Sequence, residues 1–379
     1  MVYLYYKHQK DKPVPSGKLE HLPRVTIQLP TYKEMYVVKR LITAACNVDY
    51  PKELLDVQVL DDSTDETAVI AQECVNDFKK QGFDINYIHR GSRVGFKGGA
   101  LAEGLKTAKG EYIAVFDADF VPQRDMLQKT IHFFSDKSVG MVQTRWSFLN
   151  NKYSLLTRIQ AILLDGHFVI EHSARNWSGR FFNFNGTAGI WRKEAIETAG
   201  GWQNDTLTED LDLSYRAQIK GWKFIFLKDE TSPSEIPVDI NAFKTQQYRW
   251  AKGSIQTAKK LLPEIMKSNL PLRIKIEAFF HLTNNVSYML MLILSLLMYP
   301  SMVARINIGW FQMLVTDAPF LLVATVGISF FYTCSQKEAY KDWKQKCTDL
   351  MRSGLKIDAI KACRTATGMG LKEAKAACE

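Results

Sequence analysis

Carboxylates recur in this sequence where a predicted strand has just ended. Asp117 and Asp119 follow the apolar run Tyr112–Phe116, and Asp62 closely follows the run Asp56–Leu60. Two carboxylates at the D-A-D spacing suit Mg²⁺ or Mn²⁺, ions that can in turn hold a diphosphate. The carboxylate of Asp62 could accept hydrogen bonds from a nucleobase or a ribose. Taken singly, these acidic residues also fit helix caps or turns.

A third acidic cluster and a glycine-rich segment add to the candidate chemistry. The stretch Thr208–Asp212 holds three carboxylates, among them Asp210, and a carboxylate near another anion or a metal can have its pKa adjusted for general-base work. A solvated acidic helix start would read the same way. Lys97, within Gly95–Gly99, offers a cation to a phosphate at the start of a helix. The alternative for those glycines is a plain turn.

The segment Gln246–Trp250 (QQYRW) joins amides, a guanidinium and an indole within about a turn and a half of a helix. The guanidinium of Arg249 is suited to forked contacts with phosphate. Trp250 can stack on the apolar face of a sugar, although a purely structural tryptophan is the alternative.

Short apolar runs alternate with longer amphipathic stretches over the first part of the chain. The runs predict strands at Arg24–Leu29, Asp56–Leu60, Ile85–Ile88 and Tyr112–Phe116. The stretches between them predict helices at Glu34–Asn47, Glu66–Lys80 and Lys97–Ala108. This alternation implies a largely parallel sheet. Ligands bind such sheets beyond the carboxyl ends of the strands, which is where the acidic residues stand.

Composition narrows the class of protein. The 379 residues are 46% hydrophobic and 12% aromatic, which excludes intrinsic disorder, and the net charge of +9 favours anionic partners. The six cysteines form no C-x-x-C pair, so neither a structural zinc nor a disulfide framework is expected. No G-x-G-x-x-G follows the first strand and no G-K-[ST] follows the glycines, which argues against a dinucleotide oxidoreductase and a P-loop.

Two apolar stretches late in the chain are long enough to cross a bilayer. Ala278–Ala304 carries no formal charge and Gly309–Ser335 carries one, Asp317; two buried core helices are the alternative. Lysine and arginine flank both outer ends while the connecting loop has only Arg305, so the large domain should face the cytoplasm. The prediction is an integral membrane protein, of the inner or plasma membrane if bacterial. The preceding segment Asn241–Lys267 is amphipathic and predicts an interfacial helix or, alternatively, a solvated surface helix.

In their order along the chain, these motifs resemble those of the family 2 glycosyltransferases, and more closely the cellulose-synthase-like group that includes plant glucomannan synthases and related bacterial enzymes. The resemblance covers about Val25 to Pro263 and includes P-T-Y-K-E, D-D-S, K-G-G-A-L, D-A-D, FNGTAGIWR, T-E-D and Q-x-x-R-W. It implies an α/β fold of GT-A type, which is Rossmann-like, with a mostly parallel sheet and flanking helices. An interfacial helix and a two-helix transmembrane hairpin would follow.

The resemblance also implies roles for individual residues. Those implied to bind the nucleotide sugar are Thr31, Tyr32, Glu34, Asp62, Lys97, Asp117 and Arg249. Those implied to bind the acceptor are Asn185, Gly186, Thr187, Glu209, Gln246 and Trp250. Asp117 and Asp119 would hold Mg²⁺ or Mn²⁺, and Asp210 would be the general base.

The activity implied is an inverting transfer of a hexose from UDP-glucose or GDP-mannose to a glycan or lipid acceptor, forming a β-glycosidic bond. Membrane lipid is an expected partner and nucleic acid is not. The alternative is a catalytically silent protein that binds sugar nucleotides or docks on membranes through its basic tail. Two departures stand out: Lys33 replaces the asparagine usual in P-x-Y-N-E, and two spans are few for a channel that conducts a polymer.

The predicted organisation is an N-terminal stub (1–23), a cytosolic glycosyltransferase domain (24–240), an interfacial segment with Q-x-x-R-W (241–275), two transmembrane helices (276–335) and a basic cytosolic tail (336–379). Within the tail, Leu355–Cys378 resembles a fragment of the C-terminal domain of ribosomal protein L7/L12, with a break between two helices at Gly368 and Gly370. This tail is a candidate docking element for a protein partner. A tail of no specific function is the alternative.

Overall fold

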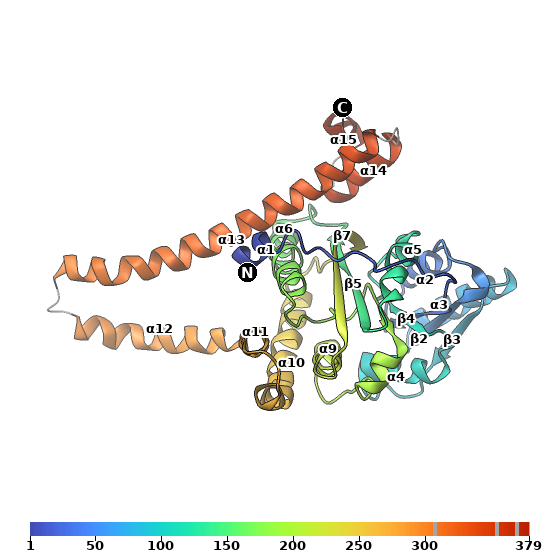
Figure 1. Cartoon of the computed structure of the whole chain (residues 1–379), viewed down its shortest axis with the longest axis horizontal. Helices are drawn as coiled ribbons and strands as arrows, with labels where there is room; N and C mark the ends of the chain where they lie inside the picture. Colours follow the sequence, from blue (N-terminus) through green and yellow to red (C-terminus); the bar gives the residue numbers. More distant parts are fainter. Residues whose placement is uncertain (306–308, 353–355, 368–370, 379) are drawn as a thin grey trace.

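A seven-stranded sheet lies at the centre of the α/β domain in the computed structural model, which describes residues 1–305, 309–352, 356–367 and 371–378 (Figure 1). Its strands, in the spatial order β3-β2-β1-β4-β6-β5-β7, are β1 (Val25–Thr31), β2 (Leu55–Asp61), β3 (Ile85–His89), β4 (Tyr112–Val115), β5 (Val139–Phe148), β6 (Gly189–Arg192) and β7 (Lys223–Ser234). Only β6 runs antiparallel to its neighbours β4 and β5. The predicted α/β fold with a mostly parallel sheet is confirmed.

The central strands are buried along their whole length because helices cover both faces of the sheet. Every residue of β1, β2 and β4 is buried. On one face pack α2 (Val38–Cys46) and α3 (Glu66–Lys80), and on the other α4 (Phe96–Thr107), α8 (Lys193–Thr198) and α9 (Glu209–Ile219). The parallel register aligns the ends of β1, β2 and β4 at one edge, where the acidic motifs begin.

The remaining elements of the domain are short. They are α1 (Val2–Lys7), a 3₁₀ turn (Lys52–Leu54), α5 (Met126–Thr130), a second 3₁₀ turn (Ile131–Ser135), α6 (Leu155–Asp165), a π-helix η3 (Gly166–His172) and α7 (Ser173–Trp177). The last three run on from one another without a break, so a wide π-helical stretch is inserted between two α-helical ones.

The helix predicted from Glu34 begins only at Val38. Lys33 holds the chain in a tight reversal after β1: its φ is +58° and its amide donates to Ser63 Oγ at 2.8 Å. Residues with a side chain seldom adopt this left-handed conformation, and asparagine tolerates it best among the common ones. The substitution of lysine for asparagine therefore falls at a strained position.

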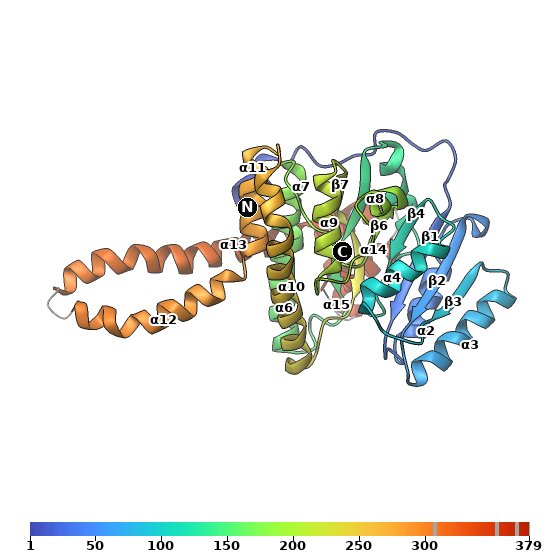
Figure 2. The same ribbon diagram turned by 90° about the horizontal axis from the view of Figure 1, so that it is seen from below.

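A helical layer follows the domain, made of α10 (Ile240–Lys267), α11 (Leu272–Thr283), α12 (Val286–Ala304) and α13 (Trp310–Arg352). The apolar stretch predicted as one unit is broken at Asn284 and Asn285, and the Asn285 amide donates to Ser254 Oγ on α10 at 2.7 Å. The helix α10 runs across the base of the hairpin and packs against α9 and α11 (Figure 2).

The hairpin of α12 and α13 projects into open space (Figures 1 and 2). The spans Val286–Ala304 and Trp310–Ala339 are long and apolar enough to cross a membrane, and none of their most apolar window is buried within the protein. They are therefore not core helices of this chain, and α13 continues past the predicted end of the second span at Ser335 to Arg352.

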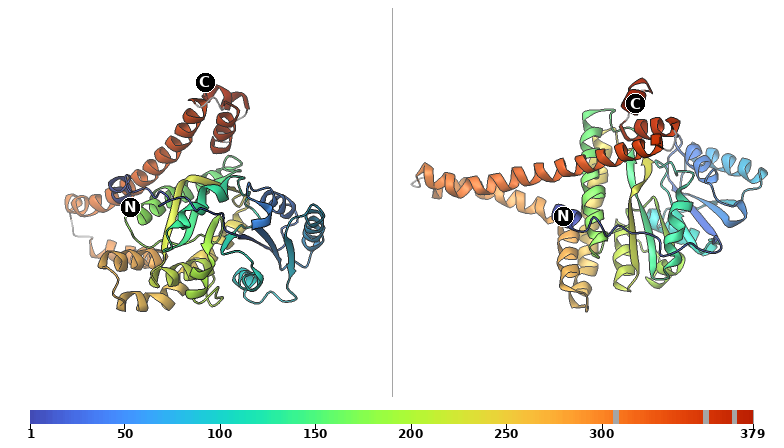
Figure 3. Two further views of the ribbon diagram at one scale, coloured as in Figure 1. Left: turned by 45° about the vertical axis from the view of Figure 1, so that its right-hand side comes forward. Right: turned by 45° about the horizontal axis from the view of Figure 1, so that its top comes forward.

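The tail folds back beside the domain, where α14 (Lys356–Thr367) contacts β5 and α15 (Leu371–Cys378) packs on α14 (Figure 3). Cys347, Cys363 and Ala374 form a small buried cluster among these helices. The predicted break at Gly368 and Gly370 lies outside the described residues.

Candidate functional site

Three distant segments meet beyond the carboxyl end of β4. The Lys97 ammonium, on the first turn of α4, lies 2.5 Å from Asp117 Oδ1 and donates to the Gly186 carbonyl at 2.9 Å. The Asp117 amide donates to Thr187 Oγ1 at 2.9 Å. The D-A-D, K-G-G-A-L and FNGTAGIWR motifs therefore share one site.

The start of α9 brings a fourth segment to this place. Gly186 has a φ of +82°, and a Cβ added there would lie 3.0 Å from Asp210 Oδ2 and 3.3 Å from Lys97 Nζ. A Cβ on Gly98 would lie 3.2 Å from the Cβ of Glu209. Glycines at these two positions thus let the turn at Gly186 and the helix α4 approach the T-E-D carboxylates closely.

Carboxylates outnumber cations in this cluster. The pKa values of several of its acids are raised by burial and by the neighbouring carboxylates. Burial and the neighbouring Asp117 raise the pKa of Asp119 to about 7. Burial and the neighbouring Glu209 raise the pKa of Asp210 to about 7, against the Leu211 amide, which donates to Asp210 Oδ1 at 2.8 Å. Burial alone would lower the pKa of Lys97, but Asp117 and Glu209 outweigh it and raise that pKa. Lys97 is thus held as a cation among acids.

A divalent cation fits the chemistry of this site. Asp117 and Asp119 supply hard oxygen atoms, and burial together with the neighbouring Asp117 makes the charged form of Asp119 costly, a cost that a bound cation would offset. Partial burial and Asp117 also raise the pKa of Glu34, which stands at the rim. Within the described ranges, no three acidic, histidine or cysteine side chains are placed to ligate one ion. A metal on the two aspartates would therefore complete its shell with oxygen atoms of a ligand or water.

The Q-x-x-R-W residues lie on α10, the helix that packs against the start of α9. Arg249 is exposed, and it is near enough to the cluster for its charge to lower the pKa of Glu209 against the larger effect of burial. Gln246 and Trp250 are half-buried one turn apart on the same helix. Among the residues that the structure describes, neither side chain forms a hydrogen bond with the carboxylates.

Close packing fixes α10 in this position. A Cβ on Gly253 would lie 2.5 Å from Thr208 Cγ2, so the helix rests directly on the start of α9. The Lys260 ammonium reaches Asp205 at 2.8 Å and Asp212 at 2.9 Å. The Q-x-x-R-W and T-E-D motifs are therefore held as one unit.

The residues predicted at the nucleoside form a second group. The Arg90 guanidinium clasps both oxygens of Asp62, with Nε donating to Oδ1 at 2.7 Å. The Arg93 guanidinium lies 3.3 Å from the ring centre of Tyr32. Thr31 is buried and its hydroxyl donates to Asp61 Oδ1 at 3.2 Å.

Arg90 and Arg93 were not among the predicted site residues. The signal that could have found them is the basic segment HRGSR between β3 and α4, at the same edge of the sheet as the acidic motifs.

Asn185 was predicted to bind the acceptor, and its side chain is turned inward. Its Oδ1 lies 2.7 Å from His172 Nε2 and its Nδ2 lies 3.1 Å from His167 Nε2. Neither histidine was predicted. Their spacing of five residues matches no regular helix face, so the pattern carried no signal.

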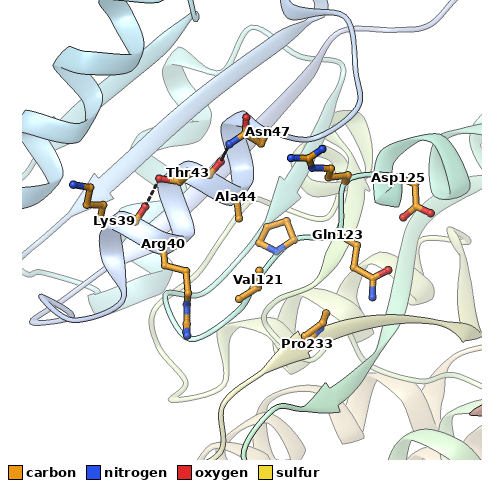
Figure 4. Close-up of a pocket in the computed structure, with 11 residues that line it drawn as sticks. Lys39, Arg40, Thr43, Ala44, Asn47, Val121, Gln123, Asp125 and Pro233 are labelled. Atoms are coloured by element: carbon orange, nitrogen blue, oxygen red, sulfur yellow. Dashed lines mark hydrogen bonds between the residues drawn. The ribbon is translucent and has the colours of Figure 1, made fainter. Parts of the chain in front are cut away.

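A surface pocket of about 900 Å³ lies apart from the carboxylate cluster, between α2 and the segment after Asp119 (Figure 4). Its lining residues are Lys39, Arg40, Thr43, Ala44, Asn47, Val121, Pro122, Gln123, Arg124, Asp125 and Pro233. None of the predicted site residues lines it.

Comparison with known proteins agrees with this geometry. Residues 23–253 match the family described as "Glycosyltransferase like family 2". The chain is 44% identical over 250 residues to a probable glucomannan 4-beta-mannosyltransferase 7 of Oryza sativa subsp. japonica, covering 64% of this chain and 43% of the relative. It is 43% identical over 254 residues to glucomannan 4-beta-mannosyltransferase 2 of Arabidopsis thaliana, covering 65% of this chain and 47% of the relative. The chain thus spans less than half the length of the curated relatives it matches.

Solved structures show the same fold. The mannosyltransferase PcManGT from Pyrobaculum calidifontis, in complex with GDP-Man and Mn²⁺, superimposes with a TM-score of 0.61 at 20% identity, over 90% of this chain and 93% of that one. S. aureus TarS 1-349 in complex with UDP-GlcNAc gives a TM-score of 0.51 at 15% identity, over 69% and 72%. At these identities the likeness concerns the fold alone.

Proposed function

Because this chain belongs to the family 2 glycosyltransferases, in their cellulose-synthase-like group, we propose that it transfers a hexose, with inversion, from a nucleotide-diphosphate sugar to a glycan or lipid acceptor. The names of its relatives favour mannose, hence GDP-mannose, over UDP-glucose as the donor. One observation carries the proposal: a carboxyl with a pKa of about 7, Asp210, faces the turn at Gly186 across from Lys97 and the D-A-D carboxylates.

The proposed mechanism is a single displacement. Asp210 takes the proton of the acceptor hydroxyl, for which a pKa of about 7 is well matched near neutral pH. The acceptor oxygen bonds to the anomeric carbon as the bond from that carbon to the diphosphate breaks, and the diphosphate leaves as an anion. Inversion of an α-linked donor gives a β-glycoside.

Cations of the chain would stabilise the departing diphosphate. Lys97 is already charged in the cluster, and the charge of Arg249 on α10 acts on Glu209 within it. Mg²⁺ or Mn²⁺, when bound at Asp117 and Asp119, would supply further positive charge for the diphosphate oxygens. At the other end, Asp62 with Arg90 and Tyr32 with Arg93 would hold the nucleoside. The turn Asn185–Thr187, with Glu209, Gln246 and Trp250, would form the acceptor side.

We further propose that the α12–α13 hairpin crosses a membrane with the α/β domain on the cytoplasmic side, and that α10 lies along the membrane surface. The support is the exposure of both apolar spans together with the excess of lysine and arginine outside them. This arrangement would keep the acceptor side of the site close to lipid.

The activity is tested by incubating membranes that contain the full chain with radiolabelled GDP-mannose or UDP-glucose and Mn²⁺ or Mg²⁺. Label is then partitioned between organic-soluble lipid and insoluble polymer. Incorporation from GDP-mannose is expected, and matched membranes without the protein are the control. Label in neither fraction from either donor contradicts the proposal.

A further inference from the structure

A partly buried network of ionisable side chains lies under the proposed acceptor turn Asn185–Thr187, and the proposed mechanism does not use it. Its members come from η3, α7, α9 and α11. His172 is fully buried and Arg175 is 5% exposed, so these groups cannot reach solvent for their hydrogen bonds. Buried polar groups must instead satisfy one another, which makes their positions mutually dependent.

The upper end of the network grips Asn185. His172 Nε2 lies 2.7 Å from Asn185 Oδ1 and 3.1 Å from the Asn183 carbonyl; since both are acceptors, Nε2 carries the proton. The Asn185 amide donates to His167 Nε2 at 3.1 Å, so the proton of His167 is on Nδ1, which lies 3.1 Å from Glu171 Oε2. One assignment of protons thus satisfies all these contacts.

The π-helix explains how both histidines reach one side chain. On an α-helix, side chains five residues apart point in widely different directions. On a π-helix, whose hydrogen bonds join residues i and i+5, such side chains lie nearer to the same face. His167 and His172 are five residues apart within η3, and the centres of their rings are separated by 4.2 Å. The wide turn therefore places both rings beneath Asn185.

The lower end of the network reaches the helix that leads into the hairpin. Glu171 Oε2 lies 3.2 Å from Arg175 Nη1, and Arg175 Nε donates to Glu277 Oε1 on α11 at 2.9 Å. Nearby, Tyr215 of α9 and His281 of α11 are hydrogen-bonded at 2.8 Å. A continuous set of contacts thus runs from α11 to the residue before Gly186.

We propose that His172 is a positioning residue for the acceptor: with His167 it orients Asn185 and so holds the Gly186–Thr187 turn against Asp210, and Arg175 with Glu277 anchors this support on α11. The inference rests on the proposed function, since it concerns the acceptor side of that site. Among the described residues, the network bonds to none of those assigned to the nucleoside, whereas the turn that it supports also bonds to Lys97 and Asp117. Loss of the network should therefore raise the KM for the acceptor more than the Kd for the donor.

The test compares His172→Leu with His172→Gln in the full chain. A glutamine amide can stand in for Nε2–H, while leucine cannot donate to Asn185. With GDP-mannose as donor and a β-1,4-linked mannotetraose as acceptor, we expect His172→Leu to raise the acceptor KM about tenfold and His172→Gln to restore it to within about threefold. Donor Kd, measured by titration with GDP-mannose and Mn²⁺, should change less than the acceptor KM in both variants.

Thr26→Val is the matched control. Thr26 is as fully buried as His172 and its hydroxyl donates to Asp56 at 2.8 Å, but it lies at the start of β1, away from the proposed site. It should lower the melting temperature and leave acceptor KM unchanged. Should His172→Leu fail to fold, Glu277→Gln carries the test, with an acceptor KM raised about threefold and a smaller change in donor Kd.

An unchanged acceptor KM, or equal rises in acceptor KM and donor Kd, overturns the inference while leaving the proposed function intact. Absence of transfer by the wild-type chain contradicts the proposed function, and the inference falls with it.

Discussion

The nucleoside end and the catalytic end of the proposed site balance their carboxylates differently. At the nucleoside end, Asp62 is clasped by Arg90 and is almost fully buried. At the catalytic end, Lys97 is surrounded by several acids, and the pKa values of Asp119 and Asp210 rise to about 7. A paired carboxylate is suited to binding, whereas an excess of carboxylates is suited to taking up a proton or a cation.

The largest effect is expected from removing the base at the catalytic end. Asp210→Asn keeps the size of the side chain but cannot take a proton near neutral pH, so kcat should fall by about 10²–10⁴-fold with donor Kd unchanged. Steady-state turnover and titration with GDP-mannose check this. Asp205→Asn, an exposed carboxyl in the preceding loop, is the matched control and should keep near-normal turnover.

A smaller effect is expected from breaking the pair at the nucleoside end. Arg90→Ala would leave Asp62 buried without a counter-charge. It would also free the start of α4 and the loop before it, because the carbonyls of Phe96 and Val94 accept from the same guanidinium. Donor Kd should rise at least about tenfold, with less change in kcat for bound donor. Arg90→Lys keeps the positive charge but loses the forked contact with Asp62, so its donor Kd should lie between those of the wild type and Arg90→Ala. An unaltered Kd in Arg90→Ala would remove the distinction between the two ends.

The charge excess also predicts how stability depends on pH. The Asp119 carboxyl has a pKa of about 3.8 when unfolded and about 7 when folded, so between these values the folded chain binds more protons. The pKa of Asp210 is raised in the same way, from about 3.8 to about 7. Their contribution to stability is therefore lost as pH rises from about 4 to 7. Mn²⁺ should restore stability at pH 7.5 and have less effect at pH 5.5, where protons compete for the carboxylates.

Melting curves at both pH values, with and without Mn²⁺, measure this. The Asp119→Asn variant is the comparison, since it should lose most of the Mn²⁺ effect. A metal effect that is equal at the two pH values would contradict the account of the catalytic end.

The smallest effect concerns the strained reversal after β1. Lys33→Asn should stabilise the fold by about 0.5–1 kcal/mol, because asparagine tolerates a φ of +58° better than lysine. Denaturant unfolding measures the gain. Lys33→Ala, which also removes the long side chain but gains no such tolerance, should not share it.

Much of the fold could be predicted because the central strands are buried on both faces. Runs such as that of β1 are rich in apolar residues, and the lengths of α3 and α4 follow from amphipathic stretches. The start of α2 was wrong, since no residue type announces the left-handed turn at Lys33. The strands β5 and β7 escaped prediction because polar residues interrupt their patterns.

The site could be predicted in its motifs but not in its supports. Asp117, Lys97, Gly186 and Asp210 converge in space as their order along the chain suggested. What holds them depends on contacts between distant segments, such as Lys260 on Asp212, which no local pattern encodes. The inward turn of Asn185 likewise follows from the π-helix, whose period ordinary sequence patterns do not reveal.

The configuration of the newly formed glycosidic bond tests the account most directly. If Asp210 activates the acceptor on the face of the sugar opposite the departing diphosphate, one displacement must invert the anomeric centre. Proton NMR of the first product formed from GDP-mannose, followed before any slow equilibration, reports this configuration. A β-linked product is predicted, and an α-linked product would contradict the account.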